Sequence, residues 1–442
     1  MAQQQLKRLL GKGFSIAVCV GLIIGLGILR TPGEIASTIS NPFVYMGLWI
    51  AGGIFVLLSV ATVAELFAIT PKSGGIYQLV RHSYGPYPAF VIGWVDWTSN
   101  CGSIAIKSVV LIEYAALLHP ELTPFITPLA LIINTLFAVL QLGGLKLGAA
   151  IQQTAAVGFG MIMLGITLAL LYAWFTNGTA VVDSVTVVDG ATSKAARYGL
   201  VAAAVIYTYD GWFAPTSFAG ETKDGGRSTA MGAIRGVMIV IAIYLVLNLA
   251  LVLAVPLSAL AGHNLALSGA IDLAFGAGAG TFVIFAALFI LMSHHNTQYM
   301  TATRTIYALS VDGLGSHHAT GVSDKGTPTG ALLFTWLAMT ALILVGGFAF
   351  LLSLTTFLFI VTYLATLIGV YRLRRKEPDI ERPYRAWGFP VVGWVCIAVW
   401  TVMAAFIGFM EPGSVLFAIG LTLVSLPVYW WLTRLRKGSG SI

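Results

Sequence analysis

Two short stretches of this chain place glycine and acidic residues inside long apolar runs. They consist of Ile23, Ile24, Gly25, Leu26, Gly27 and Ile28, and of Tyr207, Thr208, Tyr209, Asp210, Gly211 and Trp212. Glycine takes unusual backbone angles at little steric cost and lets a ligand approach the main chain. A helix interrupted there offers free N–H groups to a carboxylate and free carbonyl groups to an ammonium group. The two stretches therefore predict a binding site for an α-amino acid zwitterion.

Each stretch also has a purely structural interpretation. Gly25 and Gly27 could only allow two helices to pack closely, as small residues often do in membranes. Asp210 is the stronger signal, because an ionisable side chain deep in an apolar run is costly and is a functional hypothesis by default. Its carboxylate could attract the amine of a ligand, bind a proton, or cap a helix by accepting backbone N–H groups.

The composition predicts an integral membrane protein. The chain has 442 residues, of which 58% are hydrophobic and 9% charged, whereas soluble domains carry about 25% charged residues. The net charge of +7 does not point to nucleic acid, because the basic residues lie in short loops rather than on a soluble domain. Cys19, Cys101 and Cys396 lie far apart in apolar runs, so neither a disulfide framework nor a metal cluster is expected, and no cofactor is predicted.

Twelve apolar runs are long enough to cross a bilayer, which takes about 20 residues. They cover residues 14–39, 43–69, 88–118, 124–142, 149–175, 198–220, 236–255, 282–310, 330–350, 352–370, 391–409 and 414–432. With both termini in the cytoplasm, nearly all loop Lys and Arg residues fall on the cytoplasmic side, and only Arg30, Lys194 and Arg197 fall outside. We therefore expect a single multi-pass domain, residues 1–442, in the cytoplasmic membrane. The basic N-terminus, with no small-residue cleavage site after it, indicates no cleaved signal peptide.

The positions of the two interruptions predict an inverted repeat. Each lies in the first span of a group of five, which gives a first repeat over residues 14–175, a second over 198–370 and two additional helices over 391–432. Interrupted helices at corresponding places in two halves are typical of secondary transporters, with the substrate bound between them.

Further motifs occur in a characteristic order along nearly the whole chain. They are Ala64-Glu65-Leu66, Pro71-Lys72-Ser73-Gly74-Gly75-Ile76-Tyr77, Ala219-Gly220-Glu221, Arg304 before Tyr307-Ala308-Leu309, Asp312-Gly313-Leu314, Gly326-Thr327-Pro328, Leu373-Arg374-Arg375-Lys376-Glu377-Pro378 and Arg382-Pro383-Tyr384. Together with the two glycine stretches, they resemble permeases of the amino acid-polyamine-organocation (APC) superfamily. The resemblance is strongest to the L-type amino acid transporter branch and its bacterial exchangers.

The resemblance implies an all-α fold of the leucine-transporter type. Twelve transmembrane helices would form a five-plus-five inverted repeat with two extra C-terminal helices, the first and sixth helices being unwound in mid-membrane for alternating access. The N–H groups of Leu26 and Gly27 would hold the substrate carboxylate, and the Ile23 and Tyr207 carbonyls its amine. Tyr207 would also be an aromatic gate. Asp210 would form part of the remaining wall.

The chain departs from the family pattern at two positions. Leu26 is bulky where relatives have a small residue between the glycines, so it would narrow the pocket. Phe159 stands where many relatives carry a lysine in the fifth span, which removes a positive charge from that place. With walls expected to be apolar, a small or medium neutral amino acid is the predicted substrate.

Lys107, Asp210 and His294 are candidates for coupling transport to a proton. Lys107 is the only lysine near the middle of a span, and it could supply the missing charge or extend to a membrane interface. His294 and His295 titrate near neutral pH, but neighbours on a helix point about 100° apart, so both cannot line one small site. Either could instead hydrogen-bond Asn296 or a backbone carbonyl.

Charged residues at the predicted cytoplasmic ends of spans are gate candidates, together with Tyr207. These are Glu65, Glu221 and Arg304, which could form pairs that close the inner side or simply orient loops.

The favoured function is amino acid transport by exchange or proton coupling, with the amino acid and the lipid bilayer as the only partners inferred. Transport of cationic amino acids or polyamines is the alternative, because Asp210 puts a carboxylate beside the pocket. A sensor that binds without moving its ligand, or a membrane enzyme with His294 and His295 as metal ligands, is less favoured. Helical ligand pairs usually lie three or four residues apart, and the chain has no nucleotide-binding loop.

Overall fold

The computed structural model describes residues 10–11, 13–178, 194–223, 225–263, 265–345 and 348–438, which form helices and connecting loops. The α-helices are α1 (Phe14–Ile23), α2 (Leu26–Ala36), α3 (Pro42–Ile69), α4 (Ile76–Tyr84), α5 (Pro86–Leu118), α6 (Ile126–Gln141), α7 (Leu145–Asn177), α8 (Lys194–Thr208), α9 (Gly225–Ala254), α10 (Ala266–Phe275), α11 (Thr281–Val311), α12 (Thr329–Val345), α13 (Phe348–Lys376), α14 (Val391–Met410) and α15 (Pro412–Gly438). Short 3₁₀ helices are η1 (Pro120–Phe125), η2 (Ala214–Glu221), η3 (Leu257–Ala259) and η4 (His317–Thr320).

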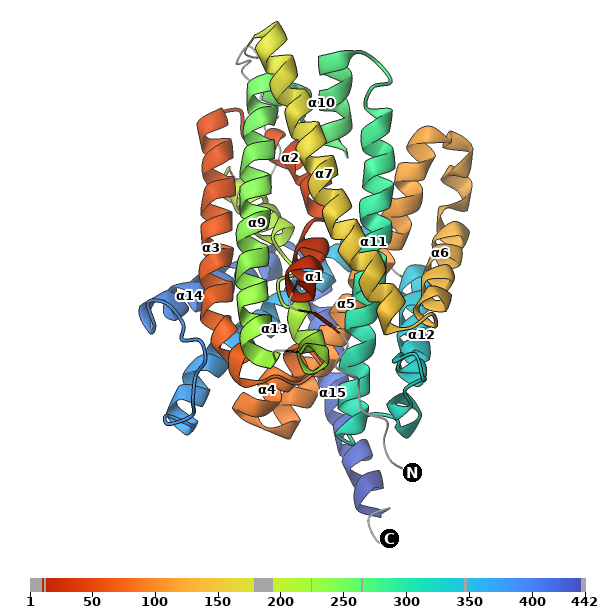
Figure 1. Cartoon of the computed structure of the whole chain (residues 1–442), viewed down its shortest axis with the longest axis vertical. Coiled ribbons are helices and arrows are strands. Elements are labelled where there is room, and N and C mark those ends of the chain that lie inside the picture. The colour runs from red at the N-terminus through yellow and green to blue at the C-terminus, as the bar shows by residue number, and fades with distance from the viewer. Residues whose placement is uncertain are drawn as a thin grey trace.

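Long helices stand side by side around a central pair of short ones. In Figure 1, α3, α7, α9 and α11 run along the length of the molecule, with α1 and α2 behind them. Helix α1 contacts α7, α9, α11 and η2, and α2 contacts α8 and α10. The short helices that carry the first glycine stretch are thus enclosed by protein.

The outer surface is apolar, as the composition predicts. Nine helices or helix pairs in the described part of the chain are long and apolar enough to cross a membrane. Large apolar side chains point outward from several of them; examples are Ile132, Met161, Leu164, Phe285 and Phe409. This is a multi-pass membrane protein. The number of twelve spans and the inverted repeat stay predictions.

The predicted span 14–39 is divided between α1 and α2, and the predicted span 198–220 contains most of α8, an irregular segment and η2, with the divisions at the two glycine stretches. The structure corrects other features of the prediction. Helix α9 begins at Gly225, 11 residues before the predicted start at 236. The prediction followed only the apolar run and so left out the polar first turns of the helix. Helices α4 and α10 were not expected, since each is too short to span a bilayer.

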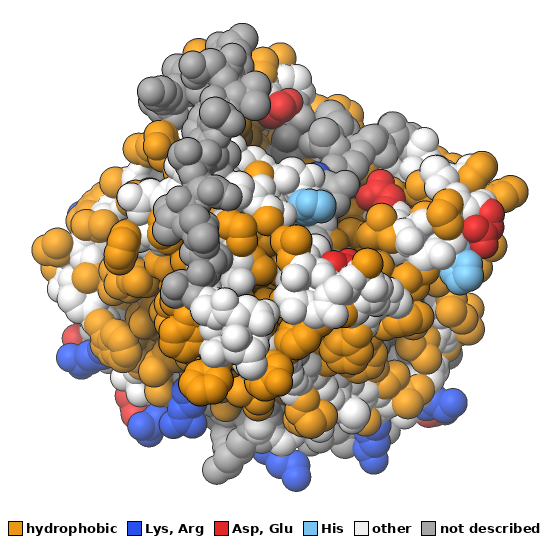
Figure 2. Space-filling view, turned by 90° about the horizontal axis from the view of Figure 1, so that it is seen from above, with side chains coloured by type: hydrophobic (Ala, Val, Ile, Leu, Met, Phe, Trp, Pro, Cys, Tyr) orange, Lys and Arg blue, Asp and Glu red, His pale blue; other side chains and the backbone are white. Residues whose placement is uncertain are grey.

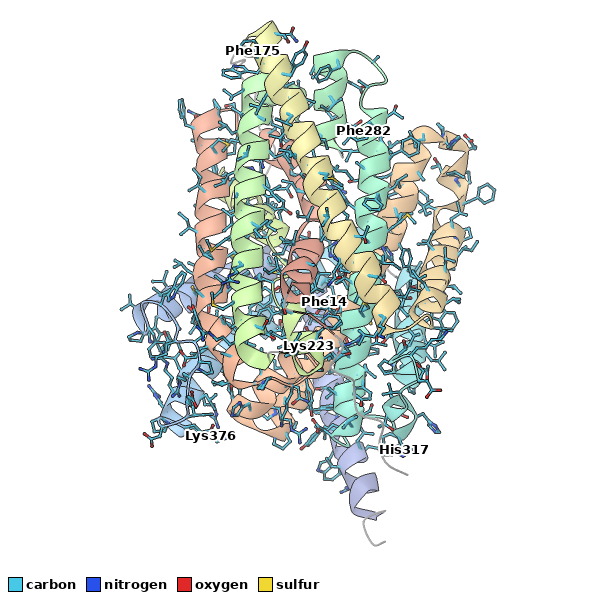
Figure 3. The ribbon with its side chains drawn as sticks, in the orientation of Figure 1. Phe14, Phe175, Lys223, Phe282, His317 and Lys376 are labelled. Carbon is cyan, nitrogen blue, oxygen red and sulfur yellow. The ribbon has the colours of Figure 1, made fainter. Side chains whose placement is uncertain are left out.

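The two ends of the molecule differ in charge. Lys223, His317 and Lys376 lie toward the lower end, whereas Phe175 and Phe282 lie toward the upper end (Figure 3). Seen from above, the face turned to the viewer is mainly apolar or uncharged with several Asp, Glu and His side chains, and most Lys and Arg side chains stand at the outline of the view (Figure 2). The cytoplasmic location of the lower end stays a prediction.

A buried carboxylate ties α3 to the end of α13 and the loop after it. The Arg374 guanidinium donates to both Glu65 oxygens, with distances of 2.9 Å and 2.6 Å. Arg382 Nε donates to Glu65 Oε1 at 3.0 Å, and the Ala386 amide donates to Oε2 at 2.9 Å. The Glu65 side chain is only 2% exposed, so four hydrogen bonds replace its hydration.

We expect Glu65→Gln to destabilise the fold while keeping its shape. The substitution leaves two guanidinium groups around a neutral amide, and breaking a buried ion pair from one side costs about 3 kcal/mol. Thermal unfolding of the purified protein in detergent measures the effect. Glu381→Gln is the control, because Glu381 is exposed and should melt as the wild type does. Equal melting of both variants would contradict the clamp.

Candidate functional site

The chain leaves helical geometry between α1 and α2. Helix α1 ends at Ile23, and the Ile24 amide still donates to the Val20 carbonyl at 2.9 Å. Gly25 occupies the N-cap of α2 and has no side chain to cap it. The first N–H groups of a helix have no partner within the helix, so those that follow Gly25 are available to a ligand, at the positive end of the helix dipole.

A second interruption lies against the first. Helix α8 ends at Thr208, and Gly211 has a φ of +119°, which favours glycine. A Cβ atom at Gly211 would lie 2.8 Å from the Leu22 carbonyl, and one at Gly27 would lie 2.8 Å from the Thr208 Cα. Main chain therefore touches main chain at both places, and glycine is what permits the contact.

Tyr244 of α9 joins the two interruptions. Its hydroxyl lies 3.0 Å from the Ile23 carbonyl oxygen and 3.4 Å from the Thr208 carbonyl oxygen. Its ring packs on Trp49 and Tyr209, at centroid distances of 5.9 Å and 5.1 Å. The sequence analysis missed this residue, because a tyrosine in an apolar run usually signals packing. The Tyr244 hydroxyl thus offers a hydrogen bond to carbonyl groups at the ends of two helices, where the helical hydrogen bonds stop.

A small cavity lies where the two interruptions meet. It offers about 60 Å³ to the centres of water molecules, room for a few waters. Its lining includes polar residues that the sequence analysis did not select: Asp96, Asn100, Thr216, Ser217, Gln298 and Thr301. The walls therefore combine these polar groups with apolar residues such as Ile76, Phe213 and Phe359. The polar residues come from α5, η2 and α11. The sequence alone does not show how these helices pack, so it could not predict that these side chains meet.

Most of the predicted site residues line this cavity. They are Ile23, Gly25, Gly27, Lys107, Tyr207, Thr208, Asp210, Gly211 and His294. Ile24 and Ile28 do not; both are fully buried in the hydrophobic core, because the flanking turns direct their side chains away from the cavity. Leu26 begins α2, but its side chain lies outside the described part of the structure. The predicted narrowing of the pocket by Leu26 therefore stays a prediction.

Lys107 is buried rather than extended to an interface. It is 5% exposed, and its Nζ donates to Ser103 Oγ at 2.7 Å and to Gln298 Oε1 at 2.8 Å. His294 Nε2 lies 3.3 Å from the same nitrogen. The other ring nitrogen, His294 Nδ1, has no hydrogen-bond partner among the described residues. A Cβ atom at Gly25 would overlap that ring, so His294 faces the first interruption.

The neighbouring histidine points elsewhere. His295 Nε2 lies 2.8 Å from Ser108 Oγ, and its Nδ1 lies 3.0 Å from the Leu291 carbonyl oxygen. The two rings therefore do not converge on one point, and the described residues contain no cluster of three or more metal-binding side chains.

Asp210 and Tyr207 lie at the boundary of the cavity. Asp210 Oδ1 is buried with no hydrogen-bond partner among the described residues, so this carboxylate oxygen is available to a donor. Tyr207 lines both this cavity and a second one of about 240 Å³, which also contains Arg30, Glu34 and Glu411. An aromatic ring between two cavities is in the position of a gate.

The remaining gate candidates lie outside the cavity and form separate pairs. Arg304 Nε and Nη2 donate to the two Glu221 oxygens, at 2.6 Å and 3.0 Å. Both side chains are nearly inaccessible, at 4% and 0% exposed. Ser73 donates weakly to Glu221 at 3.4 Å. Glu65 is not part of this pair, since Arg374 and Arg382 hold it.

Comparison with known proteins decides the family. The family model for amino acid permeases matches residues 14–432. The chain belongs to this family of the APC superfamily. The serine/threonine exchanger SteT of Bacillus subtilis is 24% identical, covering 98% of this chain and 98% of its own. The glutamate/serine transporter AimA of the same organism is 24% identical, covering 99% of this chain and 84% of its own. The human b(0,+)-type amino acid transporter 1 is 25% identical, covering 98% and 89%. The family and these relatives are transporters, which confirms the prediction that the chain is not an enzyme.

We expect Gly27→Ala to destabilise the protein by separating the two interruptions. The new methyl group would overlap the Thr208 backbone, and overpacking of this kind costs about 1–3 kcal/mol. Gly160→Ala in α7 is the control, because nothing lies within 4 Å of a Cβ atom there. Thermal unfolding compares the two. A Gly27→Ala protein as stable as Gly160→Ala would show that the main chains do not touch.

Proposed function

We propose that this chain is a secondary active transporter of small or medium neutral amino acids in the cytoplasmic membrane. It works by alternating access, through exchange or proton coupling. The observation that carries the proposal is the cavity where two interrupted helices meet, which is lined by residues at the start of α2 and by Asp210. Family membership across residues 14–432 supports it.

The fold proposed for this function has twelve spans. Residues 14–175 and 198–370 form two inverted repeats, and residues 391–432 add two helices, with both termini in the cytoplasm. Interruptions at the start of each repeat, together with the basic lower end, support this arrangement.

The cavity suits both charged ends of a zwitterion. The Leu26 and Gly27 amides at the start of α2 bind the carboxylate. The ammonium group donates to the Ile23 and Tyr207 carbonyls and to Asp210 Oδ1. Ile23 O already accepts from Tyr244, and Tyr207 O from the Asp210 amide at 2.9 Å. Since each carbonyl oxygen has two lone pairs, both can accept a further hydrogen bond.

The size and polarity of the cavity favour a small polar side chain. A space for a few waters excludes long substrates in this conformation. Hydroxyl and amide groups on the wall can hydrogen-bond a substrate hydroxyl, whereas a branched hydrocarbon side chain would leave them without partners. The names of the two bacterial relatives include serine. A cationic amino acid is the second candidate, because the cavity is lined by two carboxylates, Asp96 and Asp210, against one lysine.

Alternating access requires closure on each side in turn. Tyr207 closes the side toward the second cavity, and the buried Glu221–Arg304 pair closes the opposite side by tying η2 to α11. Glu65 contributes from α3 by fixing the end of α13. Opening the lower side then requires the Glu221–Arg304 pair to separate or to move as one body.

Serine and threonine should stabilise the purified protein in a thermal-shift screen. A ligand present at about 100 times its Kd stabilises the folded state by about 2.7 kcal/mol. Ethanolamine, which lacks the carboxylate of serine, and putrescine should give no shift, since neither can bind the start of α2. Counterflow of labelled serine in liposomes then separates a transporter from a sensor. A response to amines alone would overturn the proposed substrate class.

Lys107→Met should reduce serine transport by roughly tenfold or more. The substitution removes the hydrogen bonds of a buried charged group, each of which contributes about 1.5–3 kcal/mol. Lys107→Arg keeps the positive charge, so it should retain more transport than Lys107→Met. Exposed Lys146 provides the control, Lys146→Met. Full activity of both Lys107 variants at every pH would end any role of Lys107 in coupling.

A further inference from the structure

A continuous line of hydrogen-bonded side chains crosses between α5 and α11 beside the cavity. Asn100 Nδ2 lies 3.2 Å from Asp96 Oδ1, and Gln298 Nε2 lies 3.3 Å from Asn100 Oδ1. Lys107 Nζ lies 2.8 Å from Gln298 Oε1 and 3.3 Å from His294 Nε2. All five residues line the cavity, so the line runs along its wall.

The chemistry of the groups fixes the direction of every link. The Asn100 amide nitrogen also donates to the Asp96 carbonyl at 2.8 Å, so both acceptors around it are oxygens and Asn100 must present its NH₂ to them. Its oxygen then faces Gln298, which must donate with its own NH₂. The Gln298 oxygen is left to accept from Lys107. The line therefore runs from an ammonium group to a carboxylate, with every donor pointing the same way.

The Lys107 end of this line reaches the proposed carboxylate site. An ammonium group has three donors and no acceptor, so charged Lys107 requires His294 Nε2 to accept. The proton of neutral His294 is then on Nδ1, which has no partner among the described residues and faces Gly25. A substrate carboxylate at the start of α2 would accept from this N–H, and would draw the Lys107 charge toward itself.

The other end of the line is the Asp96 carboxylate. Asp96 is 5% exposed and accepts from Thr305 Oγ1 of α11 at 3.2 Å. Asp210 faces it from the segment between α8 and η2, and Cys101 from α5 itself. Glu221 of η2 and Arg304 of α11 form an ion pair with each other. Tyr363 of α13 lines the same cavity.

The charges around the cavity do not balance when both carboxyl groups are ionised. Asp96 and Asp210 carry two negative charges, and Lys107 carries one positive charge while His294 is neutral. A zwitterion adds no net charge, so one negative charge remains uncompensated in an enclosed space, where an unpaired charge is costly. The site is complete only when it takes up one further positive charge.

We propose that Asp96 is a proton-binding carboxylate whose protonation is linked to substrate binding through Asn100, Gln298, Lys107 and His294. Two carboxylates, that of Asp96 and that of the substrate, compete for the single Lys107 cation. When the substrate binds, Lys107 stabilises it, and Asp96 takes a proton from water and becomes a neutral acid. The amino acid and the proton are then carried together. This coupling rests on the proposed transport function, whereas the proton site itself does not.

Infrared difference spectroscopy of the purified full-length protein tests the proton site without any substrate. As the pH is lowered, the wild type should gain the C=O band of a buried protonated carboxylic acid, and Asp96→Asn should lose part of it. Asp210→Asn is the matched variant, because it removes the other carboxyl group of the cavity. The Asp96 band should remain in it but appear at a lower pH, since one negative charge has been removed. A band that Asp96→Asn does not change would overturn the assignment, whatever the protein transports.

Proton uptake on adding serine tests the link. In weakly buffered solution, serine should cause the wild type to take up about one proton per protein, and Asp96→Asn should take up none. Gln298→Met breaks the line but keeps Asp96, so its infrared band should remain while the response to serine is lost. Gln141→Met, at a buried amide outside the cavity, should respond as the wild type does.

The outcomes separate the two proposals. If no amino acid shifts the melting temperature of the wild type, the proposed function fails, and the pH titration of the Asp96 band still decides the proton site. If serine binds but Gln298→Met takes up a proton as the wild type does, the line is structural and the coupling is wrong. Melting temperatures of all variants establish that each is folded.

Discussion

Main-chain N–H and C=O groups cannot stay unpaired in hydrocarbon, and this constraint organises the centre of the molecule. The chain interrupts α1–α2 and the segment after α8 at places that touch, so that each interruption shields the other from lipid. Tyr244 supplies a donor to a carbonyl in both. Residues of both interruptions line one small cavity. A ligand that carries both an anion and a cation satisfies them more completely than water alone.

The same constraint explains where the charged residues lie. Charges within the helical bundle either line the cavity, as Lys107 and Asp210 do, or form fully bonded pairs such as Glu221 with Arg304. Breaking a bonded pair is costly, so such pairs are suited to hold one conformation shut. Charges in the cavity have partners that a ligand or a proton can replace, so they are suited to respond to occupancy.

The sequence alone identified residues that are unusual within a membrane-spanning helix. Glycines between apolar residues marked the end of α1, and Lys107 and Asp210 stood out because ionisable groups are rare at such depth. Asp96, Asn100 and Gln298 did not stand out, since α5 and α11 contain many polar residues and only the packing of the two helices shows which of them meet. The partners of Glu65 lie more than 300 residues away in the chain, a separation that no local pattern can bridge.

The position of the positive charge shows how one chemical requirement can be met from different helices. The resemblance to permeases pointed to Phe159, on the fifth predicted span, as a place where a cation is missing. In the structure Phe159 is fully buried and packs edge-on against Phe289, at a centroid distance of 5.7 Å, so it leaves no room for a charge there. Lys107 reaches the cavity from α5 instead, and it arrives with polar neighbours that fix its orientation. A cation supplied from this direction is bonded to His294 near one interruption and, through two amides, to Asp96. Its position therefore makes it a shared partner of Asp96 and of the proposed carboxylate site.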